Sequence, residues 1–244
     1  MDWRWAKIDV TIKISLTGKT VNLKTMVRLL EKDFPPSRAG RLTQLGGVLC
    51  LNFVNTTSGR GTERLLEHLF RFEHLLAWAR HAGAIDEATA KRFEADPPAT
   101  RVGQKVLERA LSLRDALHAI FTAVSKGGPA PAAALAEFNA CLAEAMAAAA
   151  IESTPQGFAW RWPAAATPPE SLLWPVVRSA AELLTEGDLT RIKVCAGCFC
   201  GWMFLDKSRN GRRRWCEMEI CGSRAKMRRY HQRQRDIAAA DNPF

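Results

Sequence analysis

The sequence predicts an α+β protein in which a mostly helical domain with a few strands precedes a small C-terminal unit built around cysteines. Two observations lead to this prediction. Apolar residues recur with a helical period through much of residues 46–188. Five cysteines then crowd into a short, strongly basic segment: Cys195, Cys198, Cys200, Cys216 and Cys221. At 244 residues, the chain can hold one good-sized domain and one small one.

Residues 1–45 are the hardest part to interpret and are treated as a poorly defined N-terminal extension. Within them, Val10–Leu16 alternates loosely like a strand, and Asp33–Gly40 contains two prolines and is typical of a linker. A clearer pattern of apolar residues begins after Gly46 and Gly47. The apolar run Val48–Val54 is interpreted as a core strand, and it leads into a polar turn that ends at Arg60.

Helices and one strand account for the remainder of the first domain. Asp86 is expected to cap a helix, and Pro175 is expected in the first turn of another. Gly157–Trp162 alternates aromatic residues with small or charged ones, which favours a strand. The expected helices cover Leu65–Ala79, Asp86–Ala95, Val106–Val124, Ala132–Ile151 and the stretch Val176–Leu184. Polar residues interrupt the alanine-rich helix, so a membrane span is not expected.

The cysteine spacing predicts a zinc site with four thiolate ligands. Cys195-x4-Cys200 and Cys216-x4-Cys221 form two equal pairs on either side of the turn signal Asn210-Gly211. Tetrahedral zinc needs four soft ligands from two short loops, so we expect one zinc ion per chain. Spacing alone leaves Cys198 as an alternative to Cys200. Disulfides are the other interpretation, but nothing in the sequence indicates export to an oxidising compartment.

The segment around these cysteines is expected to fold as a knuckle, a hairpin and a helix, an arrangement that resembles a treble clef. Trp202–Leu205 is expected as one strand, Ser208–Gly211 as the turn and Arg212–Trp215 as the return strand. A basic helix then begins at Ser223. A unit this small has too little core to fold alone, and a structural zinc site supplies the missing stability. The unit covers residues 189–236, and residues 237–244 form a tail.

Positive charge is concentrated in the same segment. Residues 191–235 contain thirteen Lys and Arg and three acids, so their net charge is +10. This equals the formal net charge of the whole chain. Thiolates around zinc would attract two or three cations, so most of this excess indicates a polyanionic partner, nucleic acid in the first place. The residues expected to contact nucleic acid are Arg209, Arg212, Arg213, Arg214, Arg224, Lys226, Arg228 and Arg229. Arg224, in the first turn of the helix, is expected to read a base.

The first domain offers one weaker candidate site. Asn52, Asn55, Thr56 and Arg60 gather at the end of the expected core strand, where they could line a pocket for a small ligand or anion. Ordinary turn capping is the alternative. A nucleophile, general base and orienting partner are not recognisable at meaningful spacing, so no catalytic residues are assigned and an enzyme is not expected.

Two stretches resemble known families. Cys195–Arg229, CAGCFCGWMFLDKSRNGRRRWCEMEICGSRAKMRR, is similar to the CGNR zinc finger, and Val48–Arg60, VLCLNFVNTTSGR, is similar to the start of the ABATE domain. This resemblance selects Cys200 over Cys198 as the second ligand and leaves Cys198 as a spare thiol. The chain departs from the pattern at two positions. Ser223 replaces the asparagine that gives the finger its name, and Asn52 replaces an aspartate.

The resemblance implies a stress-induced bacterial transcription regulator that binds DNA through its finger. Residues 46–188 would then sense a small-molecule effector or form a homodimer. The protein is expected in the cytoplasm, associated with the nucleoid and not with a membrane. Two other functional hypotheses stay open. The protein could be an RNA-binding or ribosome-associated zinc protein, or an enzyme with an accessory finger.

Overall fold

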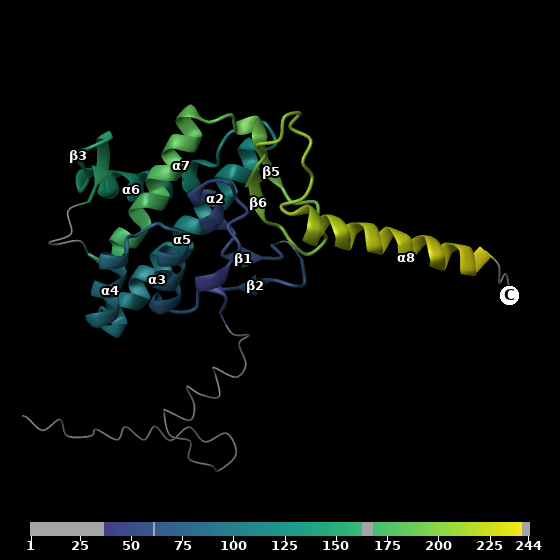
Figure 1. The fold of residues 1–244 in the computed structure, drawn as a ribbon, viewed down its shortest axis with the longest axis horizontal. Helices are drawn as coiled ribbons and strands as arrows, with labels where there is room; N and C mark the ends of the chain where they lie inside the picture. The colour runs from purple at the N-terminus through teal and green to yellow at the C-terminus, as the bar shows by residue number, and fades with distance from the viewer. Residues whose placement is uncertain (1–36, 61, 163–167, 241–244) are drawn as a thin grey trace, which may run out of the picture. The chain divides into compact units, whose positions relative to one another are not determined.

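The computed structural model describes residues 37–60, 62–162 and 168–240, and it confirms the α+β fold class (Figure 1). The elements in chain order are η1 (Ala39–Arg41), α2 (Leu49–Val54), β1 (Thr57–Ser58), β2 (Leu66–Glu67), α3 (Phe72–His81), α4 (Glu87–Ala95), α5 (Thr100–Val124), α6 (Ala132–Ala147), β3 (Ala150–Thr154), β4 (Gly157–Arg161), η3 (Pro169–Leu173), α7 (Trp174–Glu186), η4 (Leu189–Arg191), β5 (Ile192–Val194), β6 (Met203–Leu205), η5 (Met218–Gly222) and α8 (Ser223–Ala240). Among the described residues, no helix combines the length and apolar character that crossing a membrane requires.

Most helices of the first domain form where the apolar period and the caps predict them. The helix expected over Leu65–Ala79 is wrong at its start, because Leu66–Glu67 forms β2 and α3 begins at Phe72. The side chain of Asp86 accepts a hydrogen bond from Thr89 N–H at 2.8 Å and caps α4. Pro175 lies in the first turn of α7, where its missing N–H costs no helical hydrogen bond. Helix α5 buries one full face, including Val106, Leu113 and Ile120, against the neighbouring helices. Burial of these faces holds the domain together.

Helix α2 lies where a core strand was predicted, and that prediction is wrong. Leu49–Val54 is helical and packs against α5, α7 and β6. Cys50, Leu51, Phe53 and Val54 are all buried, because other elements cover this short helix on nearly every side. A fully buried run of this length looks the same in a helix and in a strand, so its period could not decide between them.

The strands form three separate antiparallel pairs: β1 with β2, β3 with β4, and β5 with β6. The strand predicted at Gly157–Trp162 is present as β4, but its partner β3 occupies residues that were assigned to the end of the alanine-rich helix. The finger hairpin also differs. Strand β6 pairs with β5, with Lys193 opposite Phe204, whereas Arg212–Trp215 forms no strand. The return strand was therefore predicted on the wrong side of β6.

The main core extends beyond the residues predicted for the first domain. Ala39 and Leu42 are buried in it, upstream of residue 46. Ile192 and Met203, from β5 and β6, are buried in the same core. The C-terminal unit therefore shares apolar surface with the helices. The expected strand Val10–Leu16 lies outside the described residues, as does the first half of the expected linker, Asp33–Pro36. The second half of that linker is wrong, because Ala39 and Gly40 belong to η1 and Ala39 is buried in the core.

Candidate metal centre and nucleic-acid interface

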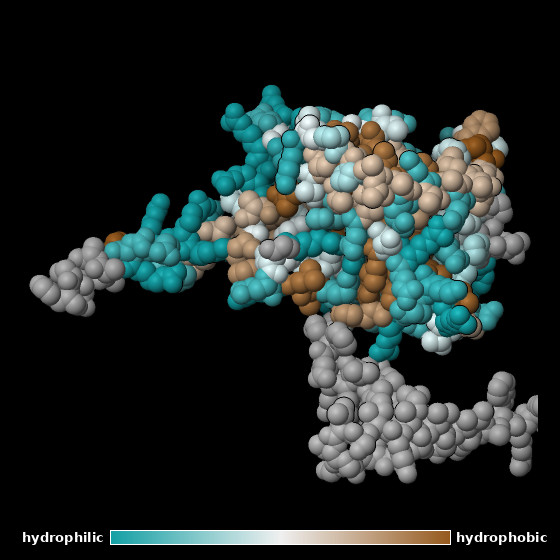
Figure 2. Space-filling view, turned by 180° about the vertical axis from the view of Figure 1, so that it is seen from behind, coloured by the Kyte–Doolittle hydropathy of each residue, from teal (hydrophilic) through white to brown (hydrophobic). Residues whose placement is uncertain are grey.

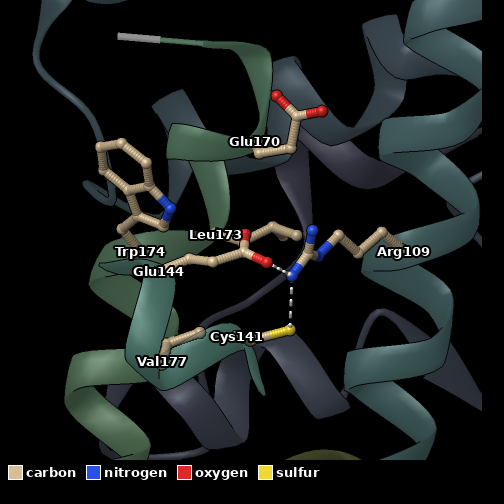
Figure 3. A pocket seen from close by; sticks show the side chains of 7 residues that line it. All are labelled: Arg109, Cys141, Glu144, Glu170, Leu173, Trp174 and Val177. Atoms are coloured by element: carbon tan, nitrogen blue, oxygen red, sulfur yellow. Dashed lines mark hydrogen bonds and ion pairs between the residues drawn. The ribbon is translucent and has the colours of Figure 1, made fainter. Parts of the chain in front are cut away.

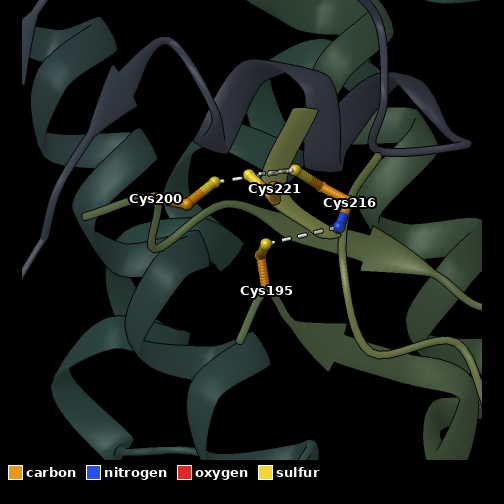
Figure 4. Close-up of side chains that lie close together, drawn as sticks. All are labelled: Cys195, Cys200, Cys216 and Cys221. Atoms are coloured by element: carbon orange, nitrogen blue, oxygen red, sulfur yellow. Dashed lines mark hydrogen bonds between the residues drawn. The ribbon is translucent and has the colours of Figure 1, made fainter. Parts of the chain in front are cut away.

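Four cysteine side chains converge at the end of the β5–β6 hairpin where a loop joins the two strands (Figure 4). Cys195, Cys200, Cys216 and Cys221 place their sulfur atoms within 4.8 Å of one another. The Sγ atoms of Cys200 and Cys216 are 3.6 Å apart, and those of Cys216 and Cys221 are 3.7 Å apart. Cys198 is exposed and lies outside this group. The structure thus brings together the four cysteines that the family resemblance selects.

These distances fit a tetrahedral zinc ion. Four Zn–S bonds of about 2.3 Å at tetrahedral angles place the sulfur atoms about 3.8 Å apart. Cys195, Cys216 and Cys221 are buried, so each would lose most of its hydration on ionising. A divalent cation compensates that loss, and four thiolates are the donor set that structural zinc prefers. We conclude that this is a zinc finger with one zinc site.

Mutual hydrogen bonding sets the protonation of the thiols. Hydrogen bonds from Cys200 and Cys216 lower the pKa of the Cys195 thiol. The bond to Cys195 raises the pKa of Cys200, and bonds to Cys195 and Cys200 raise the pKa of Cys216. Four sulfur atoms this close become thiolates together only when a cation lies among them, which is the chemistry that zinc supplies when bound.

Backbone groups hold the Cys195 sulfur in place. The N–H of Gly197 and the N–H of Cys216 lie 3.4 Å and 3.3 Å from it. Such N–H···S contacts orient a thiolate and offset its charge. A Cβ atom on Gly197 would lie 3.2 Å from the Cys221 sulfur, so glycine leaves room for the ligands at this position. In the sequence, the role of Gly197 is indicated only by its position between the ligands Cys195 and Cys200.

A second small core supports the metal centre. Phe204 is fully buried beside the ligands Cys195, Cys216 and Cys221, and Trp202 and Trp215 pack against them. Asp206, the last residue before the turn, accepts hydrogen bonds from Ser208 and from the N–H of Arg213. These contacts fix the loop that returns to Cys216. Trp202, Phe204 and Trp215 therefore form the small core of the finger.

Most of the residues predicted to contact nucleic acid are exposed. No ion pair between described residues involves any of them. Hydrophilic side chains cover most of α8, the basic helix (Figure 2). We name the following exposed cations the basic surface: Arg209, Arg212, Arg214, Arg224, Lys226, Arg228 and Arg229. Seven unpaired cations on one small unit leave a strong positive field there.

Arg213 differs from its neighbours because its guanidinium is already bound within the finger. It donates to the carbonyl oxygens of Trp215 and Cys216 and lies over the ring of Phe204 at 4.5 Å. Its charge thus supports the loop that carries Cys216. We leave Arg213 out of the basic surface, although the sequence groups it with Arg212 and Arg214.

Hydrogen bonds to backbone groups of β6 hold the finger against the first domain. Asn55, which is 3% exposed, donates from Nδ2 to the carbonyl oxygen of Met203 at 2.8 Å. Its Oδ1 accepts from the N–H of Met203, also at 2.8 Å. One side chain thus satisfies both backbone groups of a residue in β6. We call this the Asn55 clamp.

Further bonds continue on either side of the clamp. Trp202 Nε1 donates to the carbonyl oxygen of Thr57 at 3.1 Å, and Gly59 N–H donates to the carbonyl oxygen of Cys200 at 2.7 Å. Gly59 has φ +71°, and a Cβ atom there would lie 2.1 Å from the carbonyl oxygen of Arg64, so only glycine fits. Gly59 therefore allows the backbone to turn tightly beside Arg64 while its N–H bonds to the zinc ligand Cys200.

The predicted ligand-pocket residues all have partners within the chain. Asn52 Oδ1 accepts from Gly46 N–H, and Arg60 pairs with Asp115 at 2.6 Å. The hydroxyl of Thr56 donates to the carbonyl oxygen of Phe53 and accepts from Arg114. Asn52, Asn55, Thr56 and Arg60 thus all bond to other groups of the chain in this structure.

Sequence reasoning missed Arg114, a buried cation of α5. Its guanidinium forms two hydrogen bonds with the Glu67 carboxylate, at 2.7 Å and 2.6 Å, and one with Thr56. Burial raises the pKa of Glu67, but the hydrogen bonds and charge of Arg114 outweigh it and hold that pKa below its ordinary value. The pair anchors the β1–β2 hairpin, whose loop begins at Gly59. The only indication of this buried pair in the sequence is a single arginine among the apolar residues of the helix.

A small pocket lies elsewhere in the first domain, between α5, α6 and α7 (Figure 3). Its empty volume is about 190 Å³, below the range usual for small-molecule sites. Arg109 crosses it to pair with Glu144 at 2.5 Å and to reach the Cys141 sulfur at 3.8 Å. Arg109, Cys141, Glu144, Glu170, Leu173, Trp174 and Val177 line it. None of the four predicted ligand-pocket residues is among them.

Two family models match the chain, in the order that the structure indicates. Residues 47–187, more than half of the chain, match ABATE, described as "Putative stress-induced transcription regulator". Residues 191–234 match zf-CGNR, described as the CGNR zinc finger. A comparison with curated proteins gives no match. The resemblance drawn from the sequence is thereby confirmed, and the matched ranges lie inside residues 46–188 and 189–236.

Proposed function

Because the chain belongs to the ABATE family and carries a CGNR zinc finger, we propose that it is a transcription regulator that binds DNA through that finger. The observation that supports this proposal most strongly is the basic surface beside the four cysteines. Exposed and unpaired cations favour a polyanion, and a zinc-stabilised unit can hold them in a fixed arrangement.

Duplex DNA is favoured over RNA by the shape of the basic element. α8 is a helix of 18 residues, and its described side chains are exposed along most of its length. The major groove of B-DNA admits an α-helix, whereas the major groove of A-form RNA is too narrow for side chains to read. RNA binding is the second candidate, because the charge of the finger alone would suit either nucleic acid.

We propose a regulatory and not a catalytic role for the first domain. Its pocket is small, and the Arg109–Glu144 pair already occupies the polar side of it. The Asn55 clamp and its neighbouring bonds support another role for the domain, which is to hold the finger in a fixed position. Association with the nucleoid, and with it a cytoplasmic location and a part in the stress response, belong to the same proposal.

Self-association is the second role that we propose for the first domain, in preference to binding a bulky effector. The β3–β4 hairpin has Ile151 opposite Trp160 and Ser153 opposite Phe158, so these side chains share one face. Ile151 is 55% exposed and Phe158 is 81% exposed. Contact with a second copy would cover this apolar face. A symmetric dimer presents two fingers, so it predicts a DNA site made of two half-sites.

Salt titration of duplex binding tests the proposed function. If about five cations of the basic surface touch phosphates, log K should fall against log salt with a slope of roughly −4.5. The double variant Arg228→Ala, Arg229→Ala should weaken binding to all sequences alike and flatten that slope by about two. The matched control is Arg101→Ala, Lys105→Ala, which removes two exposed cations from α5 and should leave the slope unchanged.

The same titration separates the alternatives. Structured RNA that binds more tightly than duplex DNA at matched salt would favour the RNA-binding reading. Equal effects of the finger and α5 variants would mean that the basic surface is not the interface, and the proposed function would then be wrong.

A further inference from the structure

Helix α8 carries an exposed apolar stripe that the finger does not use. Met227, Tyr230 and Ile237 are 55%, 57% and 54% exposed. Together with Gln234 they follow one another at spacings of three, four and three residues, so all four lie on one face of the helix. We call these residues the α8 stripe. Large apolar side chains at this level of exposure on a helix are typical of a surface that binds a partner.

Cations border the stripe on both sides. Arg224, Arg228 and Arg235 follow spacings of four and seven residues along one edge. Lys226, Arg229 and Arg233 follow spacings of three and four along the other. The one acid described in this helix, Asp236, lies on the opposite face, where it accepts a hydrogen bond from Gln232 at 2.7 Å. The stripe is thus a narrow, nearly neutral strip between two rows of positive charge.

We propose that α8 lies in the major groove of duplex DNA with the α8 stripe against the base edges and the two rows of cations against the two phosphate backbones. This inference rests on the proposed DNA-binding function. A helix with its side chains is about 10–12 Å across, and the groove is about 12 Å wide. Phosphates line both walls of the groove, so a helix that fits it needs cations on both edges, as α8 has.

Charge complementarity selects this occupant over a second α8. Two copies of the helix packed stripe to stripe would bring four rows of cations together, and like charges at an interface oppose association. A duplex groove presents negative charge on both sides of the stripe. An anionic membrane surface also attracts basic amphipathic helices, so vesicle binding is one outcome of the test.

The chemistry of the stripe predicts what it reads. The side-chain amide of Gln234 can donate to N7 of adenine and accept from its N6–H, and Met227 offers an apolar contact to a thymine methyl group. Arg224 lies on an edge row, so its role becomes a phosphate contact, in place of the base contact that its first-turn position suggested. Specificity then comes from uncharged residues and affinity from the cations.

Selection from a random duplex DNA library tests this assignment with the full, zinc-loaded chain. Gln234→Ala should weaken binding to the selected site by about 5- to 150-fold and erase the preference for an A·T pair at one position. Its affinity for scrambled duplex and its salt slope should stay unchanged. Gln232→Ala removes the same side chain from the opposite face and should leave the selected site intact. Circular dichroism and zinc content confirm that both variants are folded.

Other results would overturn the inference. If the unaltered chain selects a site and Gln234→Ala and Met227→Ala both retain it, the stripe does not face the bases, although the proposed function stands. If the unaltered chain does not bind duplex DNA, both are wrong. Loss of binding to phosphatidylserine vesicles in Met227→Ala, with duplex selection unchanged, would assign the stripe to a membrane surface.

Discussion

Replacing Cys216 with serine should release the zinc ion and unfold the finger, the largest effect expected of any single substitution in this chain. Cys216 is 2% exposed, and its sulfur contacts those of Cys200 and Cys221. Structural zinc contributes on the order of 10 kcal/mol to the folding of small zinc units. Without it, the core around Phe204 is too small to hold the ligand loops together. Metal analysis of the purified variant measures the loss directly.

The effect should reach the first domain. Ile192 and Met203 are buried in the main core, and an unfolded finger would withdraw both. Burial of two such side chains stabilises by about 3–6 kcal/mol, so the helices should remain but melt at a lower temperature. Cys198→Ser is the matched control, because Cys198 is exposed and outside the cluster. A zinc-free Cys198→Ser variant, or a zinc-loaded Cys216→Ser variant, would contradict the ligand assignment.

Replacing Asn55 with alanine should destabilise the folded chain by about 2–6 kcal/mol, because it leaves the N–H and carbonyl of Met203 buried without partners. Each unsatisfied buried group costs about 1–3 kcal/mol. Asn55→Asp places a carboxylate, which cannot donate, against the Met203 carbonyl oxygen in a buried site, so its loss at neutral pH should be at least as large. Urea denaturation followed by tryptophan fluorescence measures both.

The control for this substitution is Asn139→Ala, which truncates the same residue type on the exposed face of α6. It should change the free energy of unfolding by less than about 0.5 kcal/mol. If Asn55→Ala were equally mild, the clamp would not hold the finger, and the proposed role of the first domain in holding it would have to be abandoned.

Local signals in the sequence were enough to locate the metal centre and most helices, although the choice of Cys200 over Cys198 as a ligand needed the family resemblance. The four ligands fall in two short loops, so their spacing predicts a common site. Asp86 and Pro175 mark helix starts through chemistry that acts within one turn. Helix α8 begins at Ser223 as predicted. In each case the information lies within a few residues of the feature that it specifies.

The remaining features depend on contacts between distant residues. Asn55 stood out as a polar residue after an apolar run, but its partner Met203 lies 148 positions further along the chain. Helix α2 is buried on nearly all sides and so shows no helical period, which is why the sequence predicts a strand there. Arg213 was grouped with Arg212 and Arg214 by charge, and only the fold shows that it turns inward to the carbonyl groups of the zinc loop.

Recovery of genomic DNA by the purified, zinc-loaded protein, followed by sequencing, tests the central claim most directly. A zinc-dependent DNA-binding regulator should enrich one reproducible motif, built from two half-sites if the chain self-associates as proposed. The Cys216→Ser protein, tested in parallel, should enrich none. Recovery of DNA without a common motif, or of the same motif by the Cys216→Ser protein, would contradict the account.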